Sequence, residues 1–132
     1  MTVCVVGAMR SGTSMVTNLL RLSGLFLGAH DDLLPPAPDN PDGFWENTRF
    51  VALNDAMLNE FGGAWDCPAV FPDNWERADL LQPIHAQAGA LIAEFAGQAH
   101  WGLEGPAHEP HDGLLEAALP GDERRAVRAQ SP

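Results

Sequence analysis

The sequence predicts an α/β fold in which a P-loop-like parallel sheet is flanked by helices. Two observations support this fold class. Residues 3–6 form a short, β-branched and uninterrupted apolar run, which is typical of a buried strand in a parallel sheet. A glycine-bounded loop follows this run directly, and a segment with helical apolar spacing follows the loop. This order of strand, tight loop and helix is the opening of a parallel crossover.

Apolar periodicity places the first helix over residues 13–23. Its apolar side chains fit one helical pattern, and Gly24 offers the left-handed conformation in which helices often end. A stiff loop comes next. Four prolines between residues 35 and 41 exclude regular structure there, and the neighbouring Asn, Asp and Gly residues favour turns.

Two more helices and a second strand are expected after this loop. Asn47 or Thr48 can cap a helix that runs to about residue 61, where two glycines follow. A third helix is predicted over about residues 83–96 by its apolar positions and by the glycine after it. Residues 100–103 then have the composition expected at the beginning of a second strand.

The charge balance excludes two classes of partner. The chain has 132 residues, with 18 Asp and Glu against 7 Arg and no Lys, and its net charge is −11. Nucleic acid and anionic membrane surfaces are therefore not expected as partners, because each needs a basic face on the protein. Any anionic ligand must be held by a local arrangement of donors.

Neither the cysteines nor the histidines have the spacing of a metal site, so we expect no metal cofactor. Cys4 and Cys67 cannot build a disulfide framework, and neither has a second Cys or His at metal-finger spacing. Pro110 breaks any helix that would present His108 and His111 on one face. Because the N-terminus lacks signal-peptide order and no apolar run could span a bilayer, we expect a cytoplasmic protein.

The loop over residues 7–14 is the strongest functional feature of the sequence. It reads Gly-Ala-Met-Arg-Ser-Gly-Thr-Ser, the spacing of a phosphate-binding loop with Thr where nucleoside-triphosphate enzymes have Lys. Glycines at both ends let backbone N–H groups point inward, and the helix N-terminus adds partial positive charge. An arginine fork and three hydroxyls add donors. The predicted anion-binding residues are Arg10, Ser11, Gly12, Thr13 and Ser14. Scaffolding without a ligand is the alternative.

Two segments of the chain resemble one enzyme family. Residues 5–14, with their Arg-Ser-Gly-Thr-Ser run, resemble the 5′-phosphosulfate loop of bacterial sulfotransferases, and residues 35–46 resemble the segment that follows it in such proteins. The resemblance covers roughly the first three quarters of the chain. It implies an α/β fold with a parallel sheet, 3′-phosphoadenosine 5′-phosphosulfate (PAPS) as donor, and sulfuryl transfer to a small-molecule or glycan hydroxyl or amine. Arg10 to Ser14 would hold the phosphosulfate, with Thr13 and Ser14 near the bridging oxygen.

Glu46 is the candidate catalytic base. Sulfuryl transfer requires a group that accepts the proton of the acceptor, and Glu46 follows the rigid proline loop and Gly43, which could aim it at the bound anion. The alternative is a structural role, in which this carboxylate lies before Asn47 and Thr48 and favours the dipole of the helix that starts there.

The composition changes from Glu104 onward. Gly, Pro and charged residues dominate the last 29 residues, and none of the ten aromatic residues lies beyond Trp101. We therefore expect two regions: a sulfotransferase-like N-terminal region over 1–103, and a divergent, disordered tail over 104–132. An incomplete sheet, whose first strand and helices lack partners for their apolar faces, would follow.

A change of reading frame is a hypothesis for this tail. The resembling family has Trp-Gly-x-Lys-Asp-Pro-Arg where residues 101–107 read Trp-Gly-Leu-Glu-Gly-Pro-Ala. Deleting one base from one permitted set of codons restores the Lys-Asp-Pro-Arg run. The coding DNA across codons 101 to 108 tests this, because the hypothesis fails if no one-base correction restores that run.

Three functions are therefore compared. The first is a PAPS-dependent sulfotransferase, of which this chain is an active form or an inactive fragment. The second is a nucleotide or small-molecule kinase with a degenerate P-loop, against which the missing lysine counts. The third is a non-catalytic anion-binding remnant.

Overall fold

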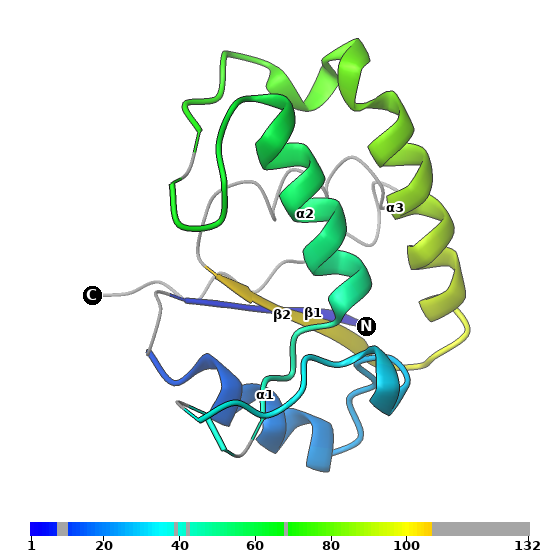
Figure 1. Cartoon of the computed structure of the whole chain (residues 1–132). Helices are drawn as coiled ribbons and strands as arrows, with labels where there is room; N and C mark the ends of the chain where they lie inside the picture. The colour runs from blue at the N-terminus through cyan, green and yellow to red at the C-terminus, as the bar shows by residue number, and fades with distance from the viewer. Residues whose placement is uncertain (8–10, 39, 42, 68, 107–132) are drawn as a thin grey trace.

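The computed structural model of the chain describes residues 1–7, 11–38, 40–41, 43–67 and 69–106 (Figure 1). This part of the chain contains a two-stranded parallel sheet and three α-helices, which confirms the α/β class and the parallel sheet. The elements are β1 (Thr2–Gly7), α1 (Thr13–Leu22), α2 (Thr48–Glu60), α3 (Gln82–Phe95) and β2 (Trp101–Pro106). Short 3-10 turns lie at His30–Asp32, Trp75–Arg77 and Asp79–Leu81.

Helices lie on both sides of the strand pair. Figure 1 shows α1 on one side of β1 and β2, and α2 with α3 on the other. The two strands run parallel with Thr2 opposite Trp101 and Gly7 opposite Pro106. Their carboxyl ends therefore meet at one edge, which is where parallel sheets place their ligand sites.

The second strand extends further than the sequence indicated. It was expected to begin within residues 100–103, and it runs from Trp101 to Pro106. The expected boundary between the two regions, at Leu103, thus falls inside β2. Residues 107–132 lie outside the described part of the chain, so the tail stays a prediction there.

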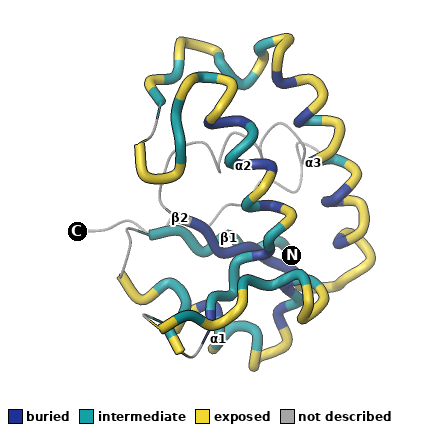
Figure 2. The backbone as a smooth tube through the Cα atoms, viewed as in Figure 1, coloured by how far each residue is buried: buried dark blue, intermediate teal, exposed yellow. Residues whose placement is uncertain are grey.

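The hydrophobic core lies between the sheet and the α2–α3 pair. Phe95 is its centre, because its ring lies 5.3 Å from that of Phe26, 5.5 Å from Phe50 and 5.4 Å from Trp101, measured between centroids. Tilted and edge-on contacts of this kind stabilise aromatic cores. In Figure 2 the buried positions of α2 and α3 face one another and the strands.

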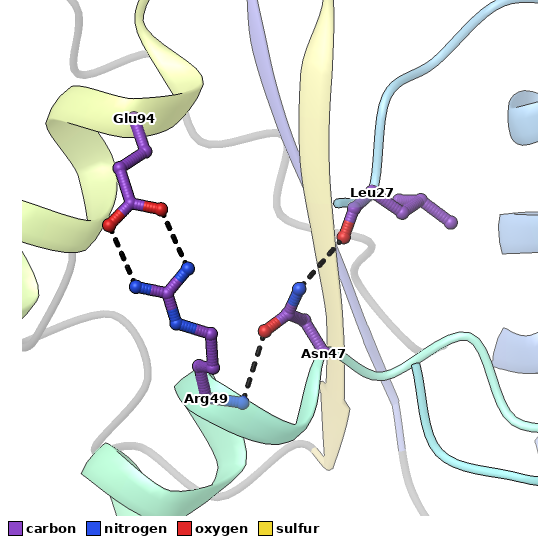
Figure 3. Close-up of polar contacts among 4 residues, drawn as sticks. All are labelled: Leu27, Asn47, Arg49 and Glu94. Atoms are coloured by element: carbon purple, nitrogen blue, oxygen red, sulfur yellow. Dashed lines mark hydrogen bonds and ion pairs between the residues drawn. The ribbon is translucent and has the colours of Figure 1, made fainter. Parts of the chain in front are cut away.

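The start of α2 is fixed by Asn47, one of the two caps that the sequence proposed. The Asn47 side-chain oxygen accepts a hydrogen bond from the backbone N–H of Arg49 at 3.1 Å, and its amide donates to the Leu27 carbonyl at 3.2 Å (Figure 3). Arg49 also forms a two-pronged ion pair with Glu94 of α3. The cap therefore ties α2 to the segment that follows α1, and the ion pair ties α2 to α3.

Helix α1 is packed less completely. Four of its large apolar side chains are exposed, from 44% to 68%: Met15, Val16, Leu19 and Leu22. Thr17 is the buried residue of this helix. Figure 2 shows this contrast with α2 and α3. An apolar stripe without a covering element is what a sheet lacking further strands and helices would leave.

The described helices were also compared with the dimensions of a bilayer. None of them is both long enough and apolar enough to cross a membrane.

Candidate functional site at the carboxyl edge of the sheet

The predicted loop lies at the carboxyl end of β1, between Gly7 and the first turn of α1. The structure describes four of its five predicted binding residues, Ser11 to Ser14. Arg10 lies outside the described residues, so its role stays a prediction. Ser11 and Gly12 are exposed, whereas Thr13 and Ser14 are half-buried. Ser11 and Gly12 are thus accessible to a ligand.

The two loop glycines meet different constraints. A Cβ atom on Gly7 would lie 2.5 Å from the Ser11 hydroxyl oxygen and 2.7 Å from a methyl carbon of Thr13, so a larger residue there would require these two side chains to move. Gly12 has a φ of 90°, a conformation that L-residues rarely adopt. The side chains of Ser11 and Thr13 therefore lie close to the end of β1, and the chain enters α1 at Gly12.

The N-terminus of α1 has donors available for an anion. No side chain among the described residues caps this helix, and its first turn carries no acidic residue. The first hydrogen bond of the helix runs from the Val16 N–H to the Gly12 carbonyl at 3.1 Å. The N–H groups before Val16 have no partner within the helix, and together with the helix dipole they favour negative charge.

Glu104 reaches this edge from the neighbouring strand. The parallel register places it opposite Val5, near the end of β2. The Ser14 hydroxyl donates a hydrogen bond to Glu104 Oε1 at 2.8 Å. The glutamate is only 5% exposed, and its Oε2 is buried without a hydrogen-bond partner among the described residues. A carboxylate in this state is costly unless a donor or a cation meets its second oxygen.

Glu46 interacts electrostatically with Glu104. Burial, and secondarily the nearby Glu104 carboxylate, raise the pKa of Glu46 from 4.5 to about 7. Its backbone is held in place on the proline-loop side, because the Glu46 carbonyl accepts from the Leu34 N–H at 3.0 Å and Asn47 pairs with Leu33 in an antiparallel bridge. A carboxyl group with a pKa near neutrality can both take and give a proton at pH 7.

The site thus contains one acidic residue that sequence reasoning missed. Glu104 was placed in the divergent tail, because the composition changes there. The signal that could have found it is positional: a charged residue three positions after Trp101, in the strand that follows α3, falls at the carboxyl edge if that strand runs parallel to β1. The histidines at 108 and 111 lie outside the described residues.

The donor set of the site is made of oxygen atoms and backbone N–H groups. Among the described residues no group of three or more His, Cys, Asp and Glu side chains is placed to hold a metal ion by itself. The available groups are the hydroxyls of the loop, the N-terminus of α1 and the carboxyls of Glu46 and Glu104. The fold and site together define an α/β protein with a hydroxyl-rich, acid-flanked loop at the end of a parallel strand.

Comparisons with protein-family models, with curated proteins and with solved structures found no match for this chain.

Proposed function

We propose that this chain is a sulfotransferase-like protein with a P-loop-like sheet, which binds PAPS through its loop over residues 10–14. In the active form, the sulfuryl group passes to a hydroxyl or amine acceptor. The observation that carries the proposal is the uncapped N-terminus of α1, which begins at Gly12 beside the end of β1. Such a terminus attracts phosphate and sulfate groups. The resemblance of the Arg-Ser-Gly-Thr-Ser run to the 5′-phosphosulfate loop of sulfotransferases is the reason for proposing PAPS as the donor.

The proposed chemistry assigns one task to each group. The acceptor atom attacks sulfur, the bond from sulfur to the bridging oxygen breaks, and the electron pair remains on the phosphate of the leaving nucleotide. Arg10 and the N–H groups of the loop would stabilise this growing charge. Glu46 would accept the proton of the acceptor, because its pKa of about 7 matches the working pH. The structural role of Glu46 before the cap of α2 remains the alternative.

Glu104 works against this proposal in its simplest form. Its buried carboxylate is hydrogen-bonded to Ser14, where a negative group opposes an incoming anion. The sulfotransferases that the chain resembles have a lysine at the corresponding position, and the change of reading frame hypothesised above would restore it. Glu104→Lys is therefore expected to raise the affinity for phosphoadenosine phosphate, the nucleotide product, by about tenfold or more in calorimetry. An unchanged or weaker affinity would count against the proposed orientation of the anion.

A test of the loop itself uses Arg10. Arg10→Ala should weaken the binding of phosphoadenosine phosphosulfate by about 1.5–3 kcal/mol, the value typical of a charge-assisted hydrogen bond. Arg77→Ala is the matched control, because Arg77 is an exposed arginine in the turn before α3, and its loss should leave the affinity unchanged. Equal affinities of the two variants would contradict the proposed loop.

The kinase alternative has one observation in its favour. In P-loop enzymes that act on nucleoside triphosphates, a loop Ser or Thr and an acidic residue from a neighbouring strand hold Mg²⁺ together. Ser14 and Glu104 are arranged as such a pair. Titrations with ATP and Mg²⁺ and with phosphoadenosine phosphate separate the alternatives, since a kinase prefers the first. Binding of phosphoadenosine phosphate without sulfuryl transfer to generic acceptors would favour the non-catalytic remnant.

A further inference from the structure

The second oxygen of Glu104 lacks a counterpart in the described part of the chain. Its Oε1 accepts from Ser14, whereas its Oε2 is buried without a hydrogen-bond partner among the described residues, and the residue is only 5% exposed. Folding places a carboxylate in such a position only at a cost, and a cation is the group that compensates it best. Through Ser14, the same carboxyl group contacts the first turn of α1, whose N-terminus favours anions, so groups of both charges could be bound at this site.

We propose that Ser14 and Glu104 bind a divalent cation of the Mg²⁺ class, with an oxyanion in the loop supplying further ligands. The proposal shares Ser14 with the proposed function, but it does not depend on PAPS being the anion.

The geometry of the pair fits two neighbouring ligands of Mg²⁺. The Ser14 hydroxyl oxygen and Glu104 Oε1 are 2.8 Å apart. In an octahedron with metal–oxygen distances of about 2.0–2.1 Å, adjacent ligands are separated by about 2.9 Å. A cation could therefore bind both oxygens with little movement of either side chain, while the Ser14 hydroxyl keeps its proton and turns it away from Glu104.

The number and type of ligands also favour Mg²⁺. This ion is usually held by one or two carboxylates, while waters and phosphate oxygens complete its coordination. A site of that kind needs no third acidic residue, which agrees with the absence of a larger ligand cluster among the described residues. The donors here are oxygen atoms alone, which hard cations such as Mg²⁺ and Mn²⁺ prefer and Zn²⁺ does not.

A bound cation would also remove the conflict within the site. Glu104 repels an anion at the N-terminus of α1, whereas a divalent ion between them attracts both. The chain carries a net charge of −11 and no lysine, so it has few positive groups of its own to offer. A metal ion would supply positive charge next to Ser14, in addition to the charge that Arg10 is predicted to contribute.

The experiment measures Mn²⁺ binding to the full chain by electron paramagnetic resonance, with Mn²⁺ standing for Mg²⁺. We expect one site in the unmodified chain and competition by Mg²⁺. Glu104→Gln should weaken binding at least tenfold, and Ser14→Ala should weaken it by a smaller factor. Glu60→Gln is the matched control, because Glu60 is an exposed glutamate at the end of α2, and it should bind like the unmodified chain.

Glu104→Gln is suited to this test because it keeps the fold. Glutamine has nearly the same shape, and its side-chain oxygen still accepts the Ser14 hydroxyl. Unchanged far-ultraviolet circular dichroism and an unchanged melting temperature or a higher one will verify this. The proposal is overturned if the unmodified chain binds no Mn²⁺, or if Glu104→Gln and Glu60→Gln bind it equally. Binding of methylammonium but not of Mn²⁺ would also overturn the proposal, because it would show that Glu104 accepts an organic ammonium group and not a metal ion.

Adding phosphoadenosine phosphate separates this inference from the proposed function. If both proposals hold, the nucleotide and Mn²⁺ strengthen one another's binding. If the metal site alone is right, Mn²⁺ binds to the unmodified chain and Glu104→Gln weakens this binding, while the nucleotide has no effect on Mn²⁺ binding. If the nucleotide binds equally well with and without Mn²⁺, and Mn²⁺ alone does not bind, the metal site is wrong and the loop proposal stands.

Discussion

The side chain of Glu104 combines two properties that surface carboxylates lack. It is buried with one oxygen unpaired by described residues, and it lies close enough to Glu46 to oppose the ionisation of that residue. Each property follows from the position of Glu104 at the end of a strand whose neighbour leads into the loop. One residue therefore contributes to the charge of the site and, after burial, to the raised pKa of the candidate base.

At this scale the first prediction concerns the pKa of Glu46. Glu104→Gln removes one of its two causes, so the pKa should fall below 7 but stay above 4.5, because burial is the larger cause. Titration of the Glu46 side-chain carbonyl by NMR measures it. A pKa that stays near 7 would mean that the two carboxyl groups do not interact.

A second prediction concerns stability and pH. The folded state holds Glu46 with a raised pKa, so the unfolded chain loses its proton first as pH rises. The associated stability is complete below about pH 4.5 and is lost as pH rises through about 7. Because the side chain is partly solvated, we expect a loss of only about 1 kcal/mol. Urea unfolding of the chain and of Glu46→Gln at pH 5 and 7.5 measures this loss. The prediction would be contradicted if the unfolding free energy changed by the same amount between the two pH values in both proteins.

Residue types near the loop could be predicted, but their neighbours across the sheet could not. The glycine spacing predicted where the chain enters α1, because the positive φ of Gly12 favours glycine there. Glu46 was nominated from its place after a rigid loop, whereas its raised pKa depends on burial and, secondarily, on Glu104, which lies 58 positions later. Pairing of distant strands sets the position of Glu104, and local sequence carries little information about it.

The elements differ in how well their ends and faces followed from the sequence. The bounds of α2 and α3 follow local signals, namely the Asn47 cap and the terminal glycines, and the structure agrees within a residue or two. The three 3-10 turns were not anticipated, since turns of this length have weak sequence signals. The apolar stripe of α1 predicted a helix correctly, but periodicity alone does not say whether a partner covers it.

The cap of α2 provides a prediction at this scale. Asn47→Ala removes the bond to the Arg49 N–H and leaves the Leu27 carbonyl without its donor, so unfolding should become easier by about 1–2 kcal/mol. Asn59→Ala changes an exposed asparagine of the same helix and serves as the control. Chemical denaturation compares them. Equal midpoints would show that the cap does not stabilise α2.

Two leucine substitutions test the difference in packing between α2, which is buried, and α1, whose apolar side chains are exposed. Leu58→Ala empties a fully buried position of α2 and should cost about 2–5 kcal/mol. Leu22→Ala, in α1, removes a side chain that is 68% exposed and should change stability by less than about 0.5 kcal/mol. Denaturant midpoints of both variants measure the difference. A large cost at Leu22 would mean that another part of the chain covers α1.

At the scale of the whole molecule, charge and topology act together. The chain is strongly acidic, yet the carboxyl edge of its two-stranded sheet carries a helix N-terminus suited to anions. The α/β class followed from the strand, loop and helix order, because that order has few packing solutions. The extent of the second strand did not, since the composition change after Trp101 favoured a tail, while pairing with β1 extends the strand to Pro106.

The location of the bound anion is the most direct test of this account. Phosphoadenosine phosphate is titrated into the ¹⁵N-labelled full chain, with and without Mg²⁺, while the backbone amide signals are followed by NMR. Binding of the anion at the loop predicts saturable shifts centred on the amides of residues 11–14 and on Glu104. Saturable shifts confined to other parts of the chain, with residues 11–14 unaffected under both conditions, would contradict it.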